Sequence, residues 1–316
     1  MALNRVMTTP RKIPAFMGTK TARNAKGARA AIFGAPHGTP YRGIDNRIHA
    51  KAADHFRLAL KDDALWLDHW DFDLGGPLLP DPGFKAVDLG NLLTKPADGP
   101  GNRKKIETTT RAILDAGAVP IMFGGDDSVP IPFIQAFSGG PPLTILQIDA
   151  HIDWREERYG ERLGFSSTMR RASEQPHVWR IVQAGARGIG SARKAELDIA
   201  KEWGAHFITS RQIHHGGLSS VLEHIEPESS CLISLDLDVL DCSAMPAVAY
   251  PSPGGLSYTQ VTDLIAGVAA KAKIVGFAMV EFVPKRDPDG TSAFTAARIA
   301  GQVLGHVARQ TKPNAA

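Results

Sequence analysis

The chain has 316 residues, of which 43% are hydrophobic and 22% are charged, and its formal net charge is +3. This composition is typical of a soluble globular protein. The basic residues are scattered and do not form a stripe, so we expect no nucleic-acid partner. No apolar run approaches the ~18 residues that a membrane span requires, so we expect no membrane partner either.

The first 29 residues contain seven Lys or Arg residues, whereas the first acidic residue of the chain is Asp45. We expect residues 1–29 to form a flexible basic arm and residues 30–316 to form one folded domain. A mitochondrial transit peptide is the alternative for this acid-poor start, but two prolines and the lack of an amphipathic period argue against it. The only two cysteines, Cys231 and Cys242, suit a reducing compartment, which favours a cytoplasmic location.

From residue 30 onward, short apolar runs alternate with longer amphipathic stretches. In chain order, the pattern predicts strand 30–36, helix 44–62, helix 102–117, strand 118–125, helix 129–137, strand 143–151, strand 178–187, helix 192–204, strand 206–210, strand 229–241, helix 258–273, strand 274–284 and helix 291–308. This order predicts an α/β fold with one domain, a doubly wound and mostly parallel sheet, and helices on both faces.

Acidic and histidine residues cluster at the carboxyl ends of four of the predicted strands. They are Asp126 and Asp127 after 118–125, Asp149, His151 and Asp153 in "DAHID", Asp236 and Asp238 in "DLDVLD", and Glu281 after "FAMV". Ligands of open parallel sheets bind beyond the carboxyl ends of the strands, so we expect these side chains to meet at one edge. If the chain stays extended, alternate residues such as Asp149, His151 and Asp153 share one face.

A single aspartate at a strand end most often belongs to a turn, and Asp126 is a natural cap for the helix that follows it. Asp236 and Asp238, however, follow a very apolar strand, where buried carboxylates are costly without a cation. Together with Asp127 and the "DAHID" residues, they provide enough ligands for two divalent ions that share carboxylates. Such carboxylate-rich sites suit manganese or a similar first-row metal better than structural zinc.

Four segments, "GGDDS", "DAHID", "SLDLDVLD" and "VEFVP", resemble in order the signatures of the arginase–agmatinase ureohydrolase family. The resemblance extends from about Ala30 to the final helix and is closest to agmatinase-like members. It implies an arginase-like three-layer fold, with residues 30–316 as the catalytic domain. It also implies a small guanidino substrate and assembly into a homo-oligomer, either a trimer or a hexamer.

The resemblance also assigns roles. Asp149 and Asp236 would bridge two divalent ions, manganese or alternatively nickel. One shell would be completed by Asp127 and Asp153, and the other by His151 and Asp238. The family reaction would be attack of a metal-bridging hydroxide on the guanidino carbon, which cleaves a C–N bond to give urea, or a substituted urea, and an amine. Asp153 would carry the proton, and Glu281 would hold the guanidinium group.

The sequence departs from the family pattern in three places. Asp127 stands where the family has histidine in "GGDHS", so the site carries an extra negative charge. Ser166 or Ser167 stands where "SHGTMFR" has a histidine, and serine cannot shuttle protons near neutral pH. After "DLDVLD", the residues Val248, Ala249 and Tyr250 replace small residues, which predicts a more apolar pocket and a substrate other than agmatine.

These departures leave an alternative open, in which the chain is a catalytically degenerate subunit that supports an active paralogue in a hetero-oligomer. A metal-dependent deacetylase fits less well, because Glu281 and the paired carboxylates match guanidine chemistry. Near the motifs, Trp154 and Arg155 could contact a substrate, whereas we expect Arg170 and Arg171 to lie on a helix surface or an interface.

Overall fold

The computed structural model describes residues 7–8, 13–39 and 41–310. Within this part of the chain, ten strands form one sheet in the order β1-β4-β3-β5-β10-β9-β6-β7-β8, and β2 also pairs with β4. Strand β1 is antiparallel to β4, and the other pairings are parallel. The strands are β1 Met7–Thr8, β2 Lys20–Thr21, β3 Ala30–Gly34, β4 Ala86–Leu92, β5 Val119–Phe123, β6 Leu143–Ile148, β7 Val178–Ala184, β8 His206–Ile208, β9 Ser230–Asp236 and β10 Lys273–Val280.

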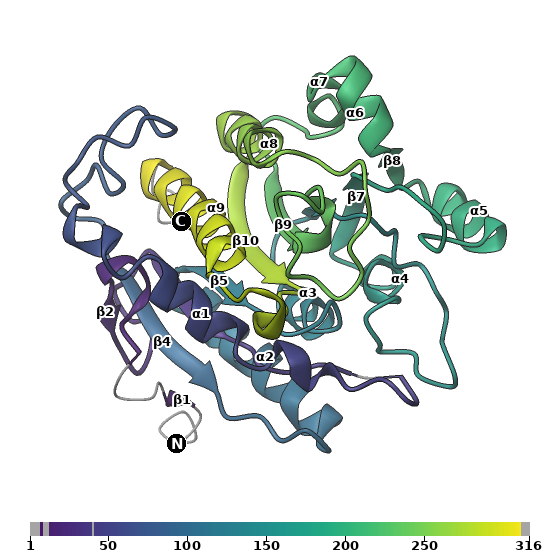
Figure 1. Ribbon diagram of the computed structural model, residues 1–316, viewed down its shortest axis with the longest axis horizontal. Helices are drawn as coiled ribbons and strands as arrows, with labels where there is room; N and C mark the ends of the chain where they lie inside the picture. The colour runs from purple at the N-terminus through teal and green to yellow at the C-terminus, as the bar shows by residue number, and fades with distance from the viewer. Residues whose placement is uncertain (1–6, 9–12, 40, 311–316) are drawn as a thin grey trace.

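Helices cover both faces of the sheet (Figure 1). The α-helices are α1 Ala52–Ala59, α2 Gly99–Asp115, α3 Pro130–Gln135, α4 Thr168–Ser173, α5 Lys194–Trp203, α6 Ser210–Gly216, α7 Ser219–Leu222, α8 Tyr258–Lys271 and α9 Thr291–Arg309. Short 3-10 helices are η2 Phe16–Gly18, η3 Asn46–His49, η4 Asp63–Leu65, η5 Leu237–Val239 and η6 Pro284–Arg286. No helix among the described residues is long and apolar enough to cross a bilayer.

Two hydrophobic cores, one on each face of the sheet, hold these layers together. One core includes Ala52 of α1, Val261 of α8 and Ala300 of α9. The other includes Ile106 of α2 and Phe133 of α3. Because the central strands are buried on both faces, their near-continuous apolar sequences follow from the architecture. The predicted single-domain α/β fold is confirmed.

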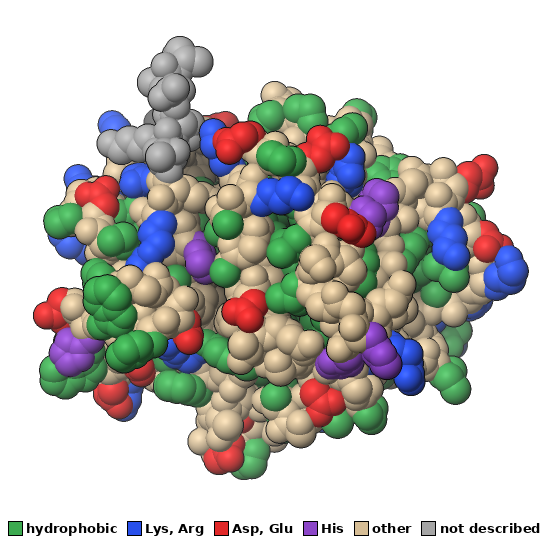
Figure 2. Space-filling view, turned by 90° about the horizontal axis from the view of Figure 1, so that it is seen from above, with side chains coloured by type: hydrophobic (Ala, Val, Ile, Leu, Met, Phe, Trp, Pro, Cys, Tyr) green, Lys and Arg blue, Asp and Glu red, His purple; other side chains and the backbone are tan. Residues whose placement is uncertain are grey.

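The solvent-exposed surface carries both positive and negative side chains. On the face shown in Figure 2, acidic and basic side chains are interspersed, and several lie next to a side chain of opposite sign. Ion pairs of this kind include Lys194 with Asp198 on α5 and Lys104 with Glu107 on α2. Exposed pairs such as these contribute little to folding stability.

Four adjacent central strands, in the order β5-β10-β9-β6, carry the acidic segments. Since all four are parallel, their carboxyl ends meet at one rim of the sheet. The loop after β3 also reaches this rim, where Gly125 lies against it. A Cβ atom at Gly125 would be 1.6 Å from the carbonyl oxygen of His37, so only glycine permits this approach.

Several predicted elements differ from the structure. The sequence pattern predicts no element over residues 63–101, yet this stretch contains the internal strand β4. The predicted helix 44–62 is divided into η3 and the shorter α1. Strand β6 ends at Ile148, so Asp149, His151 and Asp153 do not belong to an extended strand, and alternation along a strand does not align them as predicted.

The prediction of a free arm over residues 1–29 is also wrong for residues 13–29. Phe16 is fully buried in the core, and its N–H donates to Asp88 Oδ2 of β4 at 2.9 Å. Ala25 and Ala28 are buried as well. An apolar side chain therefore anchors this basic segment to the sheet, although charge dominates its composition. Residues 1–6 and 9–12 lie outside the described part of the chain.

Candidate functional site

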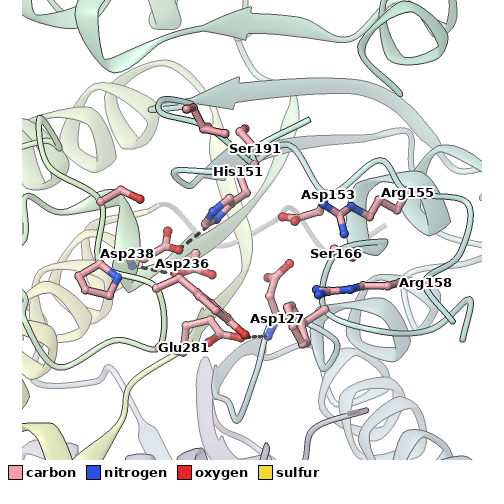
Figure 3. A pocket seen from close by; sticks show the side chains of 17 residues that line it. Asp127, His151, Asp153, Arg155, Arg158, Ser166, Ser191, Asp236, Asp238 and Glu281 are labelled. Carbon is pink, nitrogen blue, oxygen red and sulfur yellow. Dashed lines mark hydrogen bonds and ion pairs between the residues drawn. The ribbon is translucent and has the colours of Figure 1, made fainter. Parts of the chain in front are cut away.

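A cavity of about 420 Å³ opens at the carboxyl ends of the central strands (Figure 3). Seven of the predicted site residues line it: Asp127, His151, Asp153, Ser166, Asp236, Asp238 and Glu281. The eighth, Asp149, is 2% exposed and lies beside His151, whose backbone N–H donates to Asp149 Oδ1 at 2.6 Å. The structure therefore brings all eight predicted residues together.

Local backbone geometry aims these side chains at the cavity. Asp236 is the last residue of β9, and its Oδ1 accepts a hydrogen bond from the N–H of Asp238 at 2.8 Å. Asp153 and Glu281 have positive φ values of 49° and 70°. Residues other than glycine rarely adopt this backbone conformation, and when they do, they cluster at functional sites. Glu281 is held by two bonds, because its N–H donates to the Gly125 carbonyl and its Oε1 accepts from the Asp127 N–H, both at 2.9 Å.

Two groups of ligand atoms have the spacing to hold metal ions. In the first group, Asp149, His151 and Asp238 offer atoms within 4.8 Å of one another. In the second group, Asp127, Asp149 and Asp236 do the same. Asp149 belongs to both groups, as a bridging carboxylate would. Asp153 lines the same cavity but is in neither group, and its Oδ2 accepts from Gln147 Nε2 at 2.7 Å.

The carboxylates of this cluster repel one another. Burial, and then the neighbouring charges of Asp153 and Asp149, raise the pKa of Asp127 well above its ordinary value. Burial and nearby carboxylates likewise raise the pKa values of Asp153 and Asp236, and the pKa of Glu281 rises to about 8. Without a compensating cation, the folded protein would need to protonate these groups.

His151 is the counterpart of this negative charge. Its Nδ1 lies 3.1 Å from Asp238 Oδ2 and 3.5 Å from Asp149 Oδ1. Burial lowers the pKa of the imidazole, but the hydrogen bonds and charges of these two carboxylates outweigh that effect and raise the pKa to about 12. The two carboxylates therefore favour positive charge at the position of the His151 ring.

Asp127 provides the clearest test of whether a metal fits. Its side chain is 3% exposed, and neither carboxylate oxygen has a hydrogen-bond partner among the described residues. The preceding Asp126 is different, because Oδ1 accepts from the Ser128 N–H at 3.1 Å and Oδ2 accepts from Asn46 Nδ2. Asp126 therefore stabilises the loop, but the prediction that it caps the next helix was wrong, because the N-cap of α3 is Val129 and no side chain caps that helix. Asp127 instead presents bare oxygens beside Asp149 and Asp236, which is the donor set that a divalent cation prefers.

The structure shows which of the two serines, Ser166 or Ser167, lies in the cavity. Ser166 lines the cavity, its N–H donates to the Tyr41 hydroxyl at 2.9 Å, and its hydroxyl is hydrogen-bonded to the same group. Ser167 is fully buried and does not line the cavity. Tyr250 lines the cavity as predicted.

The flanking residues fall into two sets. Arg155 lines the cavity, whereas Trp154 is buried and its Nε1 donates to Gln183 at 2.7 Å. Arg170 and Arg171 form ion pairs with Glu156 and Glu174 and do not line the cavity, as expected, but Arg171 is buried and does not lie on the helix surface.

Sequence reasoning missed His49. Its Nε2 is 3.4 Å from Glu281 Oε2, and its Nδ1 is 2.9 Å from the Phe282 carbonyl oxygen. His49 thus contacts the side chain of Glu281, which lines the cavity, although His49 itself does not line it. It belongs to a stretch expected to be plain helix, and nothing in its spacing signals this contact.

Comparison with known proteins agrees with this geometry. The model of the arginase family matches residues 28–305. The chain belongs to this family. It is 26% identical over 310 residues to proclavaminate amidinohydrolase of Streptomyces clavuligerus, covering 94% of both chains. The structure of that protein superimposes with a TM-score of 0.80, covering 95% of this chain and 99% of the other. N(1)-aminopropylagmatine ureohydrolase of Thermus thermophilus is 34% identical over 196 residues, or 61% of this chain and 62% of the relative.

Proposed function

We propose that this arginase-family chain is a metal-dependent hydrolase that cleaves a C–N bond of a guanidino compound, releasing urea or a substituted urea and an amine. The observation that carries the proposal is Asp127, a buried carboxylate beside Asp149 and Asp236 whose two oxygens have no hydrogen-bond partner in the described part of the chain. The names of the relatives, an amidinohydrolase and a ureohydrolase, support the same reaction class.

Six residues would hold two divalent ions. Asp149, shared by both ligand groups, would bridge them together with Asp236. Asp127 and Asp153 would complete one shell, and His151 and Asp238 the other. We propose manganese, with nickel as the alternative, because oxygen-rich sites with one imidazole suit these metals. When bound, the ions would lower the pKa of a water and so supply a nucleophile for the poorly electrophilic guanidino carbon.

The remaining residues would position the substrate and move the proton. Glu281 is buried and held by two hydrogen bonds, so it presents a fixed carboxylate to a guanidinium group. Asp153 lines the same cavity and would carry a proton to the departing nitrogen. Ser166 cannot replace the proton-shuttling histidine, but its hydroxyl can hydrogen-bond to a substrate nitrogen.

The test is urea release by purified protein that has been reconstituted separately with manganese and with nickel. The substrates are agmatine, arginine, guanidinobutyrate, guanidinopropionate, guanidine and biguanides. We expect turnover of at least one substrate, and we expect Glu281→Gln to lower kcat/KM by about 10²-fold or more, because the substrate cation loses its buried partner. Glu202→Gln, an exposed change on α5, is the control and should have no effect.

Metal content is measured alongside. If the protein binds two metals and turns over none of these compounds, the hydrolase proposal fails, and a subunit that supports an active paralogue becomes the better account. Homo-oligomerisation and a cytoplasmic location remain predictions; the first can be measured by sedimentation velocity of the purified chain.

A further inference from the structure

Two arginines stand on one wall of the cavity that holds the acidic cluster. Arg155 and Arg158 belong to the segment between Asp153 and α4, and both line the cavity. Figure 3 shows them on the side of Asp153 and Ser166, whereas Asp236, Asp238 and Glu281 lie on the other side. The arginines thus add positive charge to one side of a cavity whose carboxylates suit metals and a guanidinium group, and the proposed chemistry does not use that positive charge.

The guanidinium group of Arg158 is available to a ligand. Among the described residues, no side-chain hydrogen bond or ion pair to a carboxylate involves it; instead it lies 4.9 Å from the ring centre of Tyr41 and 5.4 Å from that of Tyr159. Stacking on an aromatic face orients the planar group and leaves its N–H edge free. Arg155 is only weakly engaged, since its Nε is 3.9 Å from Glu196 Oε1.

Other arginines nearby are already paired. Arg162, in the same segment, is 2.6 Å from Glu156 Oε1, and Arg171 is 2.9 Å from Glu174 Oε1. Neither lines the cavity. Within this region, the arginines that face the cavity are therefore those with weak or no acidic partners. This arrangement favours an acidic ligand group over a neutral one.

We propose that the substrate is a guanidino acid, with a carboxylate at the end opposite its guanidino group, and that Arg158, assisted by Arg155, binds that carboxylate. The inference rests on the proposed function. Arginine matches a carboxylate through two parallel hydrogen bonds. A cationic tail, such as a primary amine, would be repelled at the same place. The aromatic rings of Phe165 and Tyr250, 6.2 Å apart and stacked, also line the cavity and would contact the methylene groups between the two ends.

The experiment compares three substrates with the same guanidino group on the metal-loaded protein: 4-guanidinobutyrate, which is acidic, agmatine, which is basic, and butylguanidine, which has no second charge. We expect kcat/KM to be highest for the acid. Arg158→Gln should lower the ratio of kcat/KM for the acid to that for butylguanidine by roughly 10–100-fold, mainly through KM, because a charge-assisted bidentate contact is lost.

Arg158→Glu should reverse the order of the acid and agmatine. Arg162→Gln is the matched control and should leave all three values unchanged. Butylguanidine turnover by each variant shows whether it is folded. If agmatine or butylguanidine is hydrolysed at least as well as the acid, this inference is overturned while the proposed function stands. If none of the three is hydrolysed, and neither is any other guanidino compound, both are overturned.

Discussion

At the scale of single residues, Asp127 and its neighbour Asp126 have opposite environments although both are buried carboxylates. Asp126 is hydrogen-bonded through both oxygens, to Ser128 and to Asn46, whereas Asp127 has no partner for either oxygen among the described residues. A buried carboxylate without a partner destabilises the fold unless a cation compensates it. The unpaired aspartate therefore implies a role other than stability.

We expect Asp127→Asn to stabilise the metal-free protein by about 1–3 kcal/mol, because the asparagine needs no protonation when it is buried. The same change should abolish most of the stabilisation that added manganese or nickel provides, since one ligand group is broken. Thermal unfolding in the presence of a chelator and of each metal measures both effects.

Asp126→Asn is the matched comparison. It places an amide where two donors point at carboxylate oxygens, so it should destabilise both the metal-free and the metal-loaded protein. If metal-free Asp127→Asn melts at a lower temperature than the parent, the buried carboxylate of Asp127 does not destabilise the fold as proposed.

At the scale of elements, strand β4 shows how tertiary contacts allow an unfavourable sequence to form a strand. Its residues "AVDLGNL" include Asp, Gly and Asn, which are depleted in strands. The structure compensates for them: Arg57 of α1 donates to both oxygens of Asp88, at 2.7 and 2.9 Å, and to Asn91 Oδ1 at 2.6 Å. Arg57 is fully buried and Asp88 is 2% exposed. This link joins a helix to the sheet and also anchors Phe16.

Arg57→Met should destabilise the protein by about 3–5 kcal/mol, because it leaves the carboxylate of Asp88 buried without its cation. Urea unfolding of the variant and the parent gives the difference. Lys104→Met removes the cation of an exposed pair with Glu107 and should change stability by less than about 1 kcal/mol. Equal effects of the two changes would show that the buried pair has no special weight.

At the scale of the whole molecule, the carboxylates at the rim link stability to pH. The pKa values of Asp127 and Asp236 are raised in the folded protein and that of Glu281 rises to about 8, so these groups bind protons more tightly in the folded state than in the unfolded state. The stability that comes from these protons is complete below the ordinary carboxylate pKa and is lost as the pH rises through the raised values. His151, whose pKa is raised to about 12, shifts stability in the same direction above its ordinary pKa.

The melting temperature of the metal-free protein should therefore fall between pH 5 and pH 8. Added metal should oppose this fall, and its effect should grow with pH, because the ligands must lose protons to bind it. Thermal unfolding at several pH values, with chelator and with metal, provides the measurement. A metal-free melting temperature that rises over this interval would contradict the buried acidic cluster.

The fold class followed from patterns that are local in the sequence. Apolar runs such as the one in β9 are near-continuous because the strand is buried on both faces, and Ser257 caps the N-terminus of α8 in a capping box that includes Gln260. Strand β4 could not be found in this way. Its polar residues are stabilised by Arg57, which is 31 residues from Asp88 in the chain.

The sequence by itself determined the α/β architecture and the set of acidic residues at the strand ends, because burial periodicity and the rule that parallel strands end at one edge are both readable locally. Only the tertiary structure added Arg158 to the cavity and placed His49 against Glu281. Arg158 and His49 acquire their positions from contacts with Tyr41 and Glu281, residues distant in the chain. Contacts of this kind depend on how the loops close over the rim, and no local pattern encodes that closure.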